Sequence, residues 1–195
     1  MRELFPTVAA EAAVYLNLTP GDPGLRLLTR NRDFRIGLSL AIDRPTIIRE
    51  VYGGDADAAQ VAPRPESPFY NDHMARQYTA YDVERANQHL DKAGCTLRDL
   101  SGFRLRPDGR RVALVIEVAD TPVQSAWPAV AERVCAAWRD VGVEASLRVQ
   151  DADALFWRRL SNAFDAVVCE GGSGVAVQVE PAYYLPASPL RSSFA

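Results

Sequence analysis

Histidine and cysteine, the side chains that most often build catalytic and metal centres, are scarce in this sequence. Its 195 residues include two histidines and three cysteines. The cysteines, Cys95, Cys135 and Cys169, show no metal-ligand spacing, and we expect Cys135 and Cys169 to be buried thiols that pack as small apolar groups. His73 and His89 have no partner at metal or triad spacing, and His89 is expected to be a solvated surface residue. The sequence therefore predicts no metal, no cofactor and no enzyme.

Long apolar runs and an excess of positive charge are also absent. No apolar run approaches the ~20 residues of a membrane-spanning helix, and the N-terminus lacks the apolar core of a signal peptide. A net charge of −3 opposes the broad positive surface that nucleic-acid binding requires, so we expect no nucleic-acid partner. The one basic cluster flanks a turn at 107–109, and we interpret it as a solvated hairpin tip, with a phosphate or membrane contact as the alternative. Its members are Arg104, Arg106, Arg110 and Arg111.

The composition is that of an ordinary soluble globular protein, with 48% hydrophobic and 24% charged residues. The length predicts a single domain over residues 1–195. The chain opens in a short alanine-rich segment and finishes on a proline- and serine-bearing tail without a closing element. We therefore expect it to be a piece of a larger protein.

A proline interrupts the longest helical pattern, "DFRIGLSLAIDRPTIIREVYGG", at residues 33–54. Proline inside a helix costs roughly 3 kcal/mol, whereas in the first turn its missing N–H would be unpaired anyway. The pattern therefore predicts two helices joined by a tight corner. Asp33 is predicted to cap the first helix and Asp43 the second, which holds Pro45 in its first turn and ends at Gly53–Gly54.

The remaining elements alternate between strands and helices and contain no internal repeat. A long irregular loop over 55–80 is expected to be functional or docked on the surface. Alternating strands and helices favour an α/β or α+β fold with a mixed sheet and helices packed on it. The predicted elements are a strand at 14–18, helices at 25–29 and 83–93, a hairpin whose longer strand covers 112–119, a helix at 125–141, a strand at 143–149, a helix at 151–161 and a strand at 164–169.

A glycine-rich loop, "EGGSG" at 170–174, follows the last predicted strand. It lacks the lysine and hydroxyl residue of a phosphate-binding loop, and the residues after it look extended rather than helical. Glycine lets a backbone approach a ligand closely, and ligands of open α/β sheets collect beyond the carboxyl ends of strands. Carboxylates elsewhere look scattered and solvated, with no pair expected in a buried place. The pattern indicates binding rather than catalysis.

Several stretches together resemble family 5 extracellular solute-binding proteins, the peptide- and nickel-type receptors of ABC importers. The residues that carry the resemblance begin with "FRIGLSLAIDRPTIIREVYGG", which suggests that the corner is a fold landmark rather than a ligand site. Further stretches agree in the same order and cover nearly the whole chain: "YLNLT", "APRPESPFY", "YDVERANQHLDKAG", "GFRLRPDG", "AERVCAAWRDVGVE", "FDAVV" and "EPAYYLP".

The resemblance implies a receptor of two lobes that close over a solute, a peptide in the first place. This chain would be the second lobe of that periplasmic-binding-protein-like fold, with 1–13 and 182–195 as crossing or tail segments towards the first lobe. The intact protein would lie outside the cytoplasm, in a periplasm or anchored at the cell surface, and work with ABC permease and ATPase subunits. A receptor-like module for signalling or protein contact is the alternative. We also expect the isolated lobe to self-associate in part, because its lobe-facing surface is uncovered.

The resemblance also indicates candidate ligand-binding residues near the last strand. Relatives hold a peptide amino terminus with a carboxylate after this strand, within an aromatic and Asp pattern that is absent here. Opines, sugars, modified peptides and metal chelates therefore stay open as solutes. The two arginines in the set are either carboxylate anchors or a solvated helix face. The candidates are Arg158, Arg159, Glu170, Gly171, Gly172, Ser173 and Tyr183.

Overall fold

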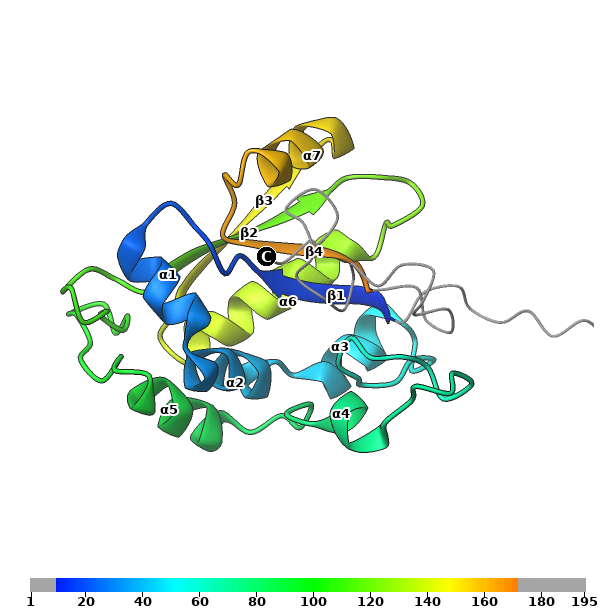
Figure 1. The fold of residues 1–195 in the computed structure, drawn as a ribbon, viewed down its shortest axis with the longest axis horizontal. Coiled ribbons are helices and arrows are strands. Elements are labelled where there is room, and N and C mark those ends of the chain that lie inside the picture. Colours follow the sequence, from blue (N-terminus) through cyan, green and yellow to red (C-terminus); the bar gives the residue numbers. More distant parts are fainter. Residues whose placement is uncertain (1–9, 172–195) are drawn as a thin grey trace, which may run out of the picture.

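Within the described residues four strands form one sheet, and its mixed character is as the sequence predicts. The structure, a computed structural model, describes residues 10–171 (Figure 1). The sheet order is β1-β4-β2-β3, with β2 parallel to both β3 and β4, and β1 antiparallel to β4. The strands are β1 (Ala10–Leu16), β2 (Ala113–Ala119), β3 (Glu144–Gln150) and β4 (Ala166–Gly171).

Helices cover both faces of this sheet. The connection from β2 to β3 runs through α6 (Trp127–Asp140), and the return from β3 to β4 passes back over β2 through α7 (Ala152–Leu160). Because crossovers are right-handed, two crossovers in opposite directions place their helices on opposite faces. Residues 116 and 118 of β2 therefore face α6, and residue 117 faces α7.

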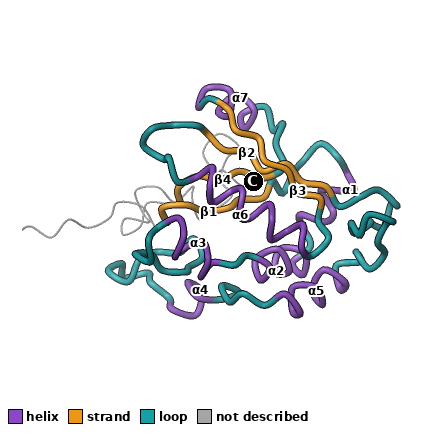
Figure 2. The backbone as a smooth tube through the Cα atoms, turned by 180° about the vertical axis from the view of Figure 1, so that it is seen from behind, coloured by secondary structure: helices purple, strands orange, loops and turns teal. Residues whose placement is uncertain are grey.

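A layer of helices lies beyond α6, at the end of the molecule opposite α7 (Figures 1 and 2). Its closest packing joins α2 to α5, because a Cβ atom at Gly37 would lie 2.8 Å from Leu90 Cγ and 3.0 Å from the Ala86 carbonyl oxygen. A glycine is therefore required where these two helices touch. The helices are α1 (Pro23–Arg30), α2 (Arg32–Ala41), α3 (Arg44–Val51), α4 (Asp72–Arg76) and α5 (Val83–Lys92).

The predicted corner between two helices is confirmed, with one change of cap. The Asp43 carboxylate accepts the Thr46 backbone N–H at 3.0 Å, and the proline lies in the first turn of α3. Asp33 does not cap α2; Asn31 does, and the Asp33 carboxylate instead lies 2.7 Å from Nδ1 of His89 on α5. The expectation that His89 is solvated is therefore wrong, since its side chain is 19% exposed and paired.

The predicted hairpin and its basic cluster are also corrected. The first strand of the hairpin is replaced by isolated bridges, and only β2 is a regular strand. Arg104 and Arg106 are buried rather than solvated. Arg106 forms ion pairs of 3.1 Å with Asp22 and 2.9 Å with Asp108, because the turn packs against the N-terminus of α1.

All three cysteines are buried, which confirms the prediction for Cys135 and Cys169. Burial raises the pKa of each of these two thiols to about 11. Both thiols therefore stay protonated at neutral pH and pack as small apolar groups.

Candidate functional site

The carboxyl ends of the three parallel strands meet at one edge of the sheet, from which the loop after β2 and the connection into α7 start. The loop after β2 exposes Val123, and α7 exposes the rings of Phe156 and Trp157. These rings lie edge to face with centroids 5.4 Å apart. Exposed aromatic rings beside the carboxyl ends of strands are suited to binding a solute or a second protein surface.

The candidate residues of the last strand are placed at the same edge. Glu170 is exposed at the end of β4, and its backbone carbonyl accepts the Tyr15 hydroxyl at 3.5 Å. Gly171 is buried and pairs with Ala10 of β1. The other three candidates, Gly172, Ser173 and Tyr183, lie outside the described residues.

The charges of Arg159 and Glu170 both act on the buried thiol of Cys169. Burial is the main cause of the raised pKa of this thiol; the positive charge of Arg159 acts against it, and the negative charge of Glu170 adds to it. Both groups are therefore close to β4. The charge of Arg159 thus reaches Cys169 on β4, and the roles of Arg159 and Glu170 toward a solute stay predictions.

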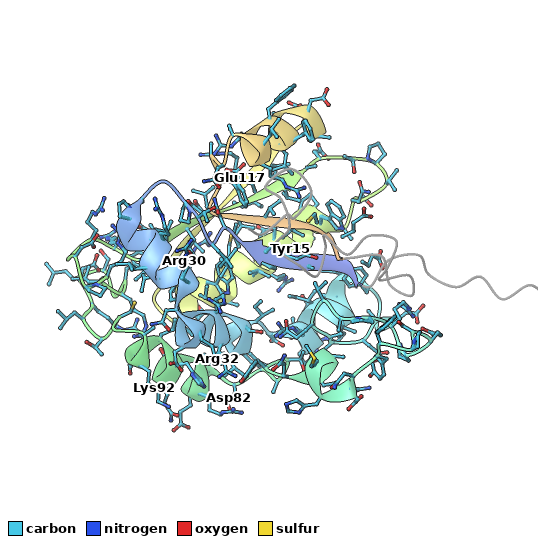
Figure 3. The ribbon with its side chains drawn as sticks, in the orientation of Figure 1. Tyr15, Arg30, Arg32, Asp82, Lys92 and Glu117 are labelled. Atoms are coloured by element: carbon cyan, nitrogen blue, oxygen red, sulfur yellow. The ribbon has the colours of Figure 1, made fainter. Side chains whose placement is uncertain are left out.

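Arg158 is placed differently from its neighbour. Its Nε and Nη2 atoms lie 2.8 Å and 2.6 Å from the two carboxylate oxygens of Glu117, which is fully buried on β2 beneath α7 (Figure 3). The two hydrogen bonds to the carboxylate compensate the guanidinium for the water that it loses there. The interpretation of the two arginines as a solvated helix face is wrong for Arg158, and its role toward a ligand stays a prediction.

Glu117 is a buried carboxylate that the sequence analysis missed. It also accepts hydrogen bonds from Arg148 Nη1 at 3.0 Å and from Gln150 Nε2 at 2.7 Å, and its charge helps to raise the pKa of Asp165. The expectation that the carboxylates are solvated is therefore wrong for Glu117. The available signal was a glutamate inside the apolar stretch "ALVIEVA".

We expect replacement of Asp165 by asparagine to stabilise the protein more as the pH rises from about 3.5 to 7. Burial and the charge of Glu117 raise the pKa of Asp165. A carboxyl group with a raised pKa contributes stability below its unfolded pKa and loses that contribution as the pH rises through its folded pKa. Asparagine keeps an oxygen for the Val115 N–H, 3.1 Å away, and has no charge to lose.

Urea unfolding of both proteins across this pH range measures the effect. The difference in free energy of unfolding, variant minus parent, should grow with pH and then level off above the folded pKa. A difference that is constant or shrinks with rising pH would show that the asparagine substitution acts by another route.

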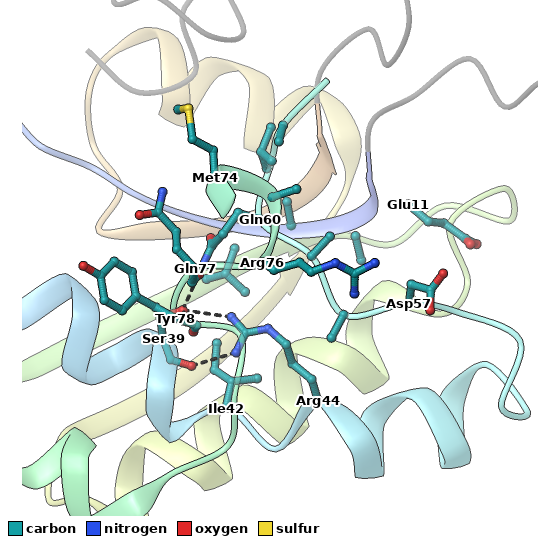
Figure 4. Close-up of a pocket in the computed structure, with 18 of the residues that line it drawn as sticks. Glu11, Ser39, Ile42, Arg44, Asp57, Gln60, Met74, Arg76, Gln77 and Tyr78 are labelled. Carbon is teal, nitrogen blue, oxygen red and sulfur yellow. Dashed lines mark hydrogen bonds between the residues drawn. The ribbon is translucent and has the colours of Figure 1, made fainter. Parts of the chain in front are cut away.

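A cavity of about 1780 Å³ lies between β1, α2, α3, α6 and the long loop (Figure 4). Arg44 donates from Nη1 to the Ser39 carbonyl at 2.7 Å and from Nη2 to the Ser39 hydroxyl at 3.0 Å, and burial lowers its pKa to about 10. Gln60 donates to the Ser39 hydroxyl at 3.2 Å and to the Gln77 carbonyl at 2.9 Å. The Gln60 bonds dock the loop over 55–80 on α2. The sequence predicts a loop that is functional or docked on the surface, and docking is confirmed.

Metal-binding clusters and helices able to span a membrane are both absent from residues 10–171. Within that range there is no group of three or more His, Cys, Asp or Glu side chains able to hold a metal ion. Of the helices described, none has the length and apolar character needed to cross a membrane.

Comparison with known proteins places the chain beside one family. Residues 6–189 match the sequence model described as bacterial extracellular solute-binding proteins, family 5 Middle. Among solved structures, an oligopeptide-binding protein OppA is similar at 27% identity and a TM-score of 0.86, over 93% of this chain and 28% of that chain. No curated protein sequence matches.

Two other solved structures share the fold at lower identity. The oligopeptide-binding protein of Thermotoga maritima with bound mannohexaose is 22% identical with a TM-score of 0.71, over 91% of this chain and 32% of that chain. NikA from Brucella suis with Fe(III)-EDTA is 20% identical with a TM-score of 0.63, over 95% of this chain and 35% of that chain. The chain thus spans about a third of the length of the structures that it matches.

Proposed function

Since the chain belongs to family 5 of the bacterial extracellular solute-binding proteins, we propose that it is one lobe of the substrate-binding component of an ABC importer. The first candidate for the solute is a peptide. Residues 1–195 form the second lobe of the whole receptor, and the segments 1–13 and 182–195 lead towards the first lobe. Residues 10–13 of the first segment pair with β4 as part of β1.

The observation that carries the proposal is the match of residues 6–189 to the family model, and the exposed charge at the end of β4 supports it. Glu170 is exposed at the end of β4, and Arg159 lies close to the same strand. A carboxylate suits the ammonium group of a peptide, and a guanidinium suits a carboxylate in bidentate geometry. The exposed rings of Phe156 and Trp157 add apolar area beside these charges.

The mechanism is closure of two lobes over the solute. A solute that contacts both lobes stabilises the closed form by its differential affinity for that form. The closed receptor then docks on the ABC permease, whose ATPase subunits drive import. The whole protein works outside the cytoplasm, in a periplasm or anchored at the cell surface. A receptor-like module for signalling is the alternative for the same fold.

Native mass spectrometry of the intact receptor, purified from its own host, tests the proposal. We expect a spread of peptide masses when the bound solute is released. Glu170→Gln should lower the retained peptide by about tenfold or more, which corresponds to about 1.4 kcal/mol or more of binding free energy. Glu84→Gln, at an exposed glutamate on α5 in the distant helix layer, is the matched control.

Three results would overturn parts of the proposal. A single small non-peptide mass would replace the peptide by a dedicated solute. Peptide retention unchanged in Glu170→Gln would remove that carboxylate from the site. A receptor that releases no solute and does not change shape with added peptides would favour the signalling module.

A further inference from the structure

We propose that Glu117 is a positioning residue for the solute site: its buried carboxylate holds Arg158, and through it α7, so that the exposed Phe156–Trp157 rings face the solute while Arg158 does not. The identification of this region as a solute site rests on the proposed function. The role of Glu117 in holding α7 rests on the geometry of its contacts. The same geometry assigns Arg158 to anchoring the helix rather than to contact with a solute.

The helix α7 has little apolar contact with the sheet. Leu155 is its one buried residue, whereas Phe156 and Trp157 are largely exposed. Helices in proteins are stabilised mainly by packing of an apolar face, and a helix of nine residues is too short to be stable by itself. Another interaction must therefore fix the position of α7.

The Glu117 carboxylate supplies that interaction from the middle of β2. Its two oxygens accept both Nε and Nη2 of Arg158, which lies in the last turn of α7. The Nη2 atom also donates to the Ala163 carbonyl in the loop that leads to β4. The pair thus joins three elements: the central strand, the end of the helix and the start of the last strand.

Arg158 is unsuited to leave this pair for a solute. The Glu117 side chain is 0% exposed, and removal of its bidentate partner would leave a buried charge poorly compensated. Arg148 and Gln150 of β3 contact the same carboxylate, but the Arg148 side chain is 44% exposed and contributes one bond. Arg159 follows on the helix and lies near Cys169 of β4 instead.

The test compares single and double variants of the intact receptor. The probe is an equimolar pool of tri- to pentapeptides, with retained peptide measured by native mass spectrometry. Trp157 reports on α7 by acrylamide quenching and fluorescence anisotropy, because Trp127 and Trp138 are buried and Trp157 is 63% exposed. The variants are Glu117→Leu, the double variant Glu117→Leu/Arg158→Leu, and Gly37→Ala as a control that strains the distant α2–α5 contact.

Glu117→Leu should lower peptide retention by about tenfold and make Trp157 more mobile. The double variant replaces a buried ion pair by two apolar side chains, an exchange that is often neutral or stabilising, so retention should return to within about threefold of the parent. Gly37→Ala should lower stability without changing retention or Trp157 mobility.

The proposal fails if Glu117→Leu retains peptide like the parent. It also fails if the double variant restores the Trp157 signal but not retention, because Arg158 would then contact the solute directly. A parent protein that retains no peptide overturns the proposed function instead. In that case the Trp157 signal alone decides whether Glu117 positions α7.

Discussion

Replacing Arg104 by methionine is expected to lower the free energy of unfolding by about 3–5 kcal/mol. The Arg104 side chain is 3% exposed and lies 2.5 Å from an Asp91 carboxylate oxygen on α5. It donates to the Asn87 side-chain oxygen at 2.7 Å, to the Val141 carbonyl at 2.8 Å, and to the Cys95 carbonyl. One guanidinium thus joins the end of α5, the end of α6 and the segment before β2.

The loss is large because methionine fills the space but satisfies none of these acceptors. The Asn87 and Val141 oxygens keep only a longer bond of 3.2 Å each from Arg98 Nη2. A buried oxygen that loses a donor pays desolvation cost, and the Asp91 side chain, which is half exposed, is the acceptor that water compensates most. Arg104→Lys keeps the charge but not the planar fork, so it should recover only part of the stability.

Urea unfolding at pH 7 measures the effect, with Arg111→Met as the matched control. Arg111 belongs to the same basic cluster and pairs with Asp99 and Glu144, but its side chain is 41% exposed. Exposed pairs contribute little, so the control should unfold close to the parent. Equal losses in Arg104→Met and Arg111→Met would contradict the assignment of Arg104 as the buried tie between the helices.

Local interactions within one or two turns were predictable from the sequence. Asp43 and Pro45 fix the start of α3 because a cap and a first-turn proline act on neighbouring backbone groups alone. The cap of α2 was assigned to Asp33 instead of Asn31 because the end of α1 was not known. Asn31 serves both helices: its N–H donates to the Leu28 carbonyl at 2.9 Å, and its side-chain oxygen accepts the Asp33 N–H at 2.8 Å.

The pairing of Arg158 with Glu117 was not predictable from the sequence. Arg158 and Glu117 are 41 residues apart, and they meet only because α7 returns over β2 on the face opposite α6. The prediction of the first hairpin strand was wrong for a related reason. The Arg104 N–H donates to the Gly142 carbonyl at 2.7 Å instead of to a neighbouring strand. The fold class therefore follows from sequence patterns, whereas the Glu117–Arg158 ion pair depends on the assembled sheet.

The corner between α2 and α3 depends on a side chain that lies far from it in sequence. The Ile42 N–H bonds the Ser39 carbonyl at 3.3 Å instead of the Leu38 carbonyl that a continuing helix would use. The indole Nε1 of Trp138, on α6, donates to that Leu38 carbonyl at 3.1 Å. Trp138 is 1% exposed, so it both fills the core and satisfies a carbonyl left over where α2 ends.

Trp138→Ala should therefore lower the free energy of unfolding by about 3–5 kcal/mol, through the lost apolar contact and the cavity that remains. Trp138→Phe keeps most of the ring and loses the N–H, so it should cost about 1–3 kcal/mol, the range for an unsatisfied buried acceptor. Urea unfolding followed by circular dichroism measures both, with Trp157→Phe on the exposed face of α7 as control. If Trp138→Phe unfolds like the parent, the Leu38 carbonyl has another donor, and the corner is held by the Asp43 cap and the Arg44 bonds to Ser39 without help from α6.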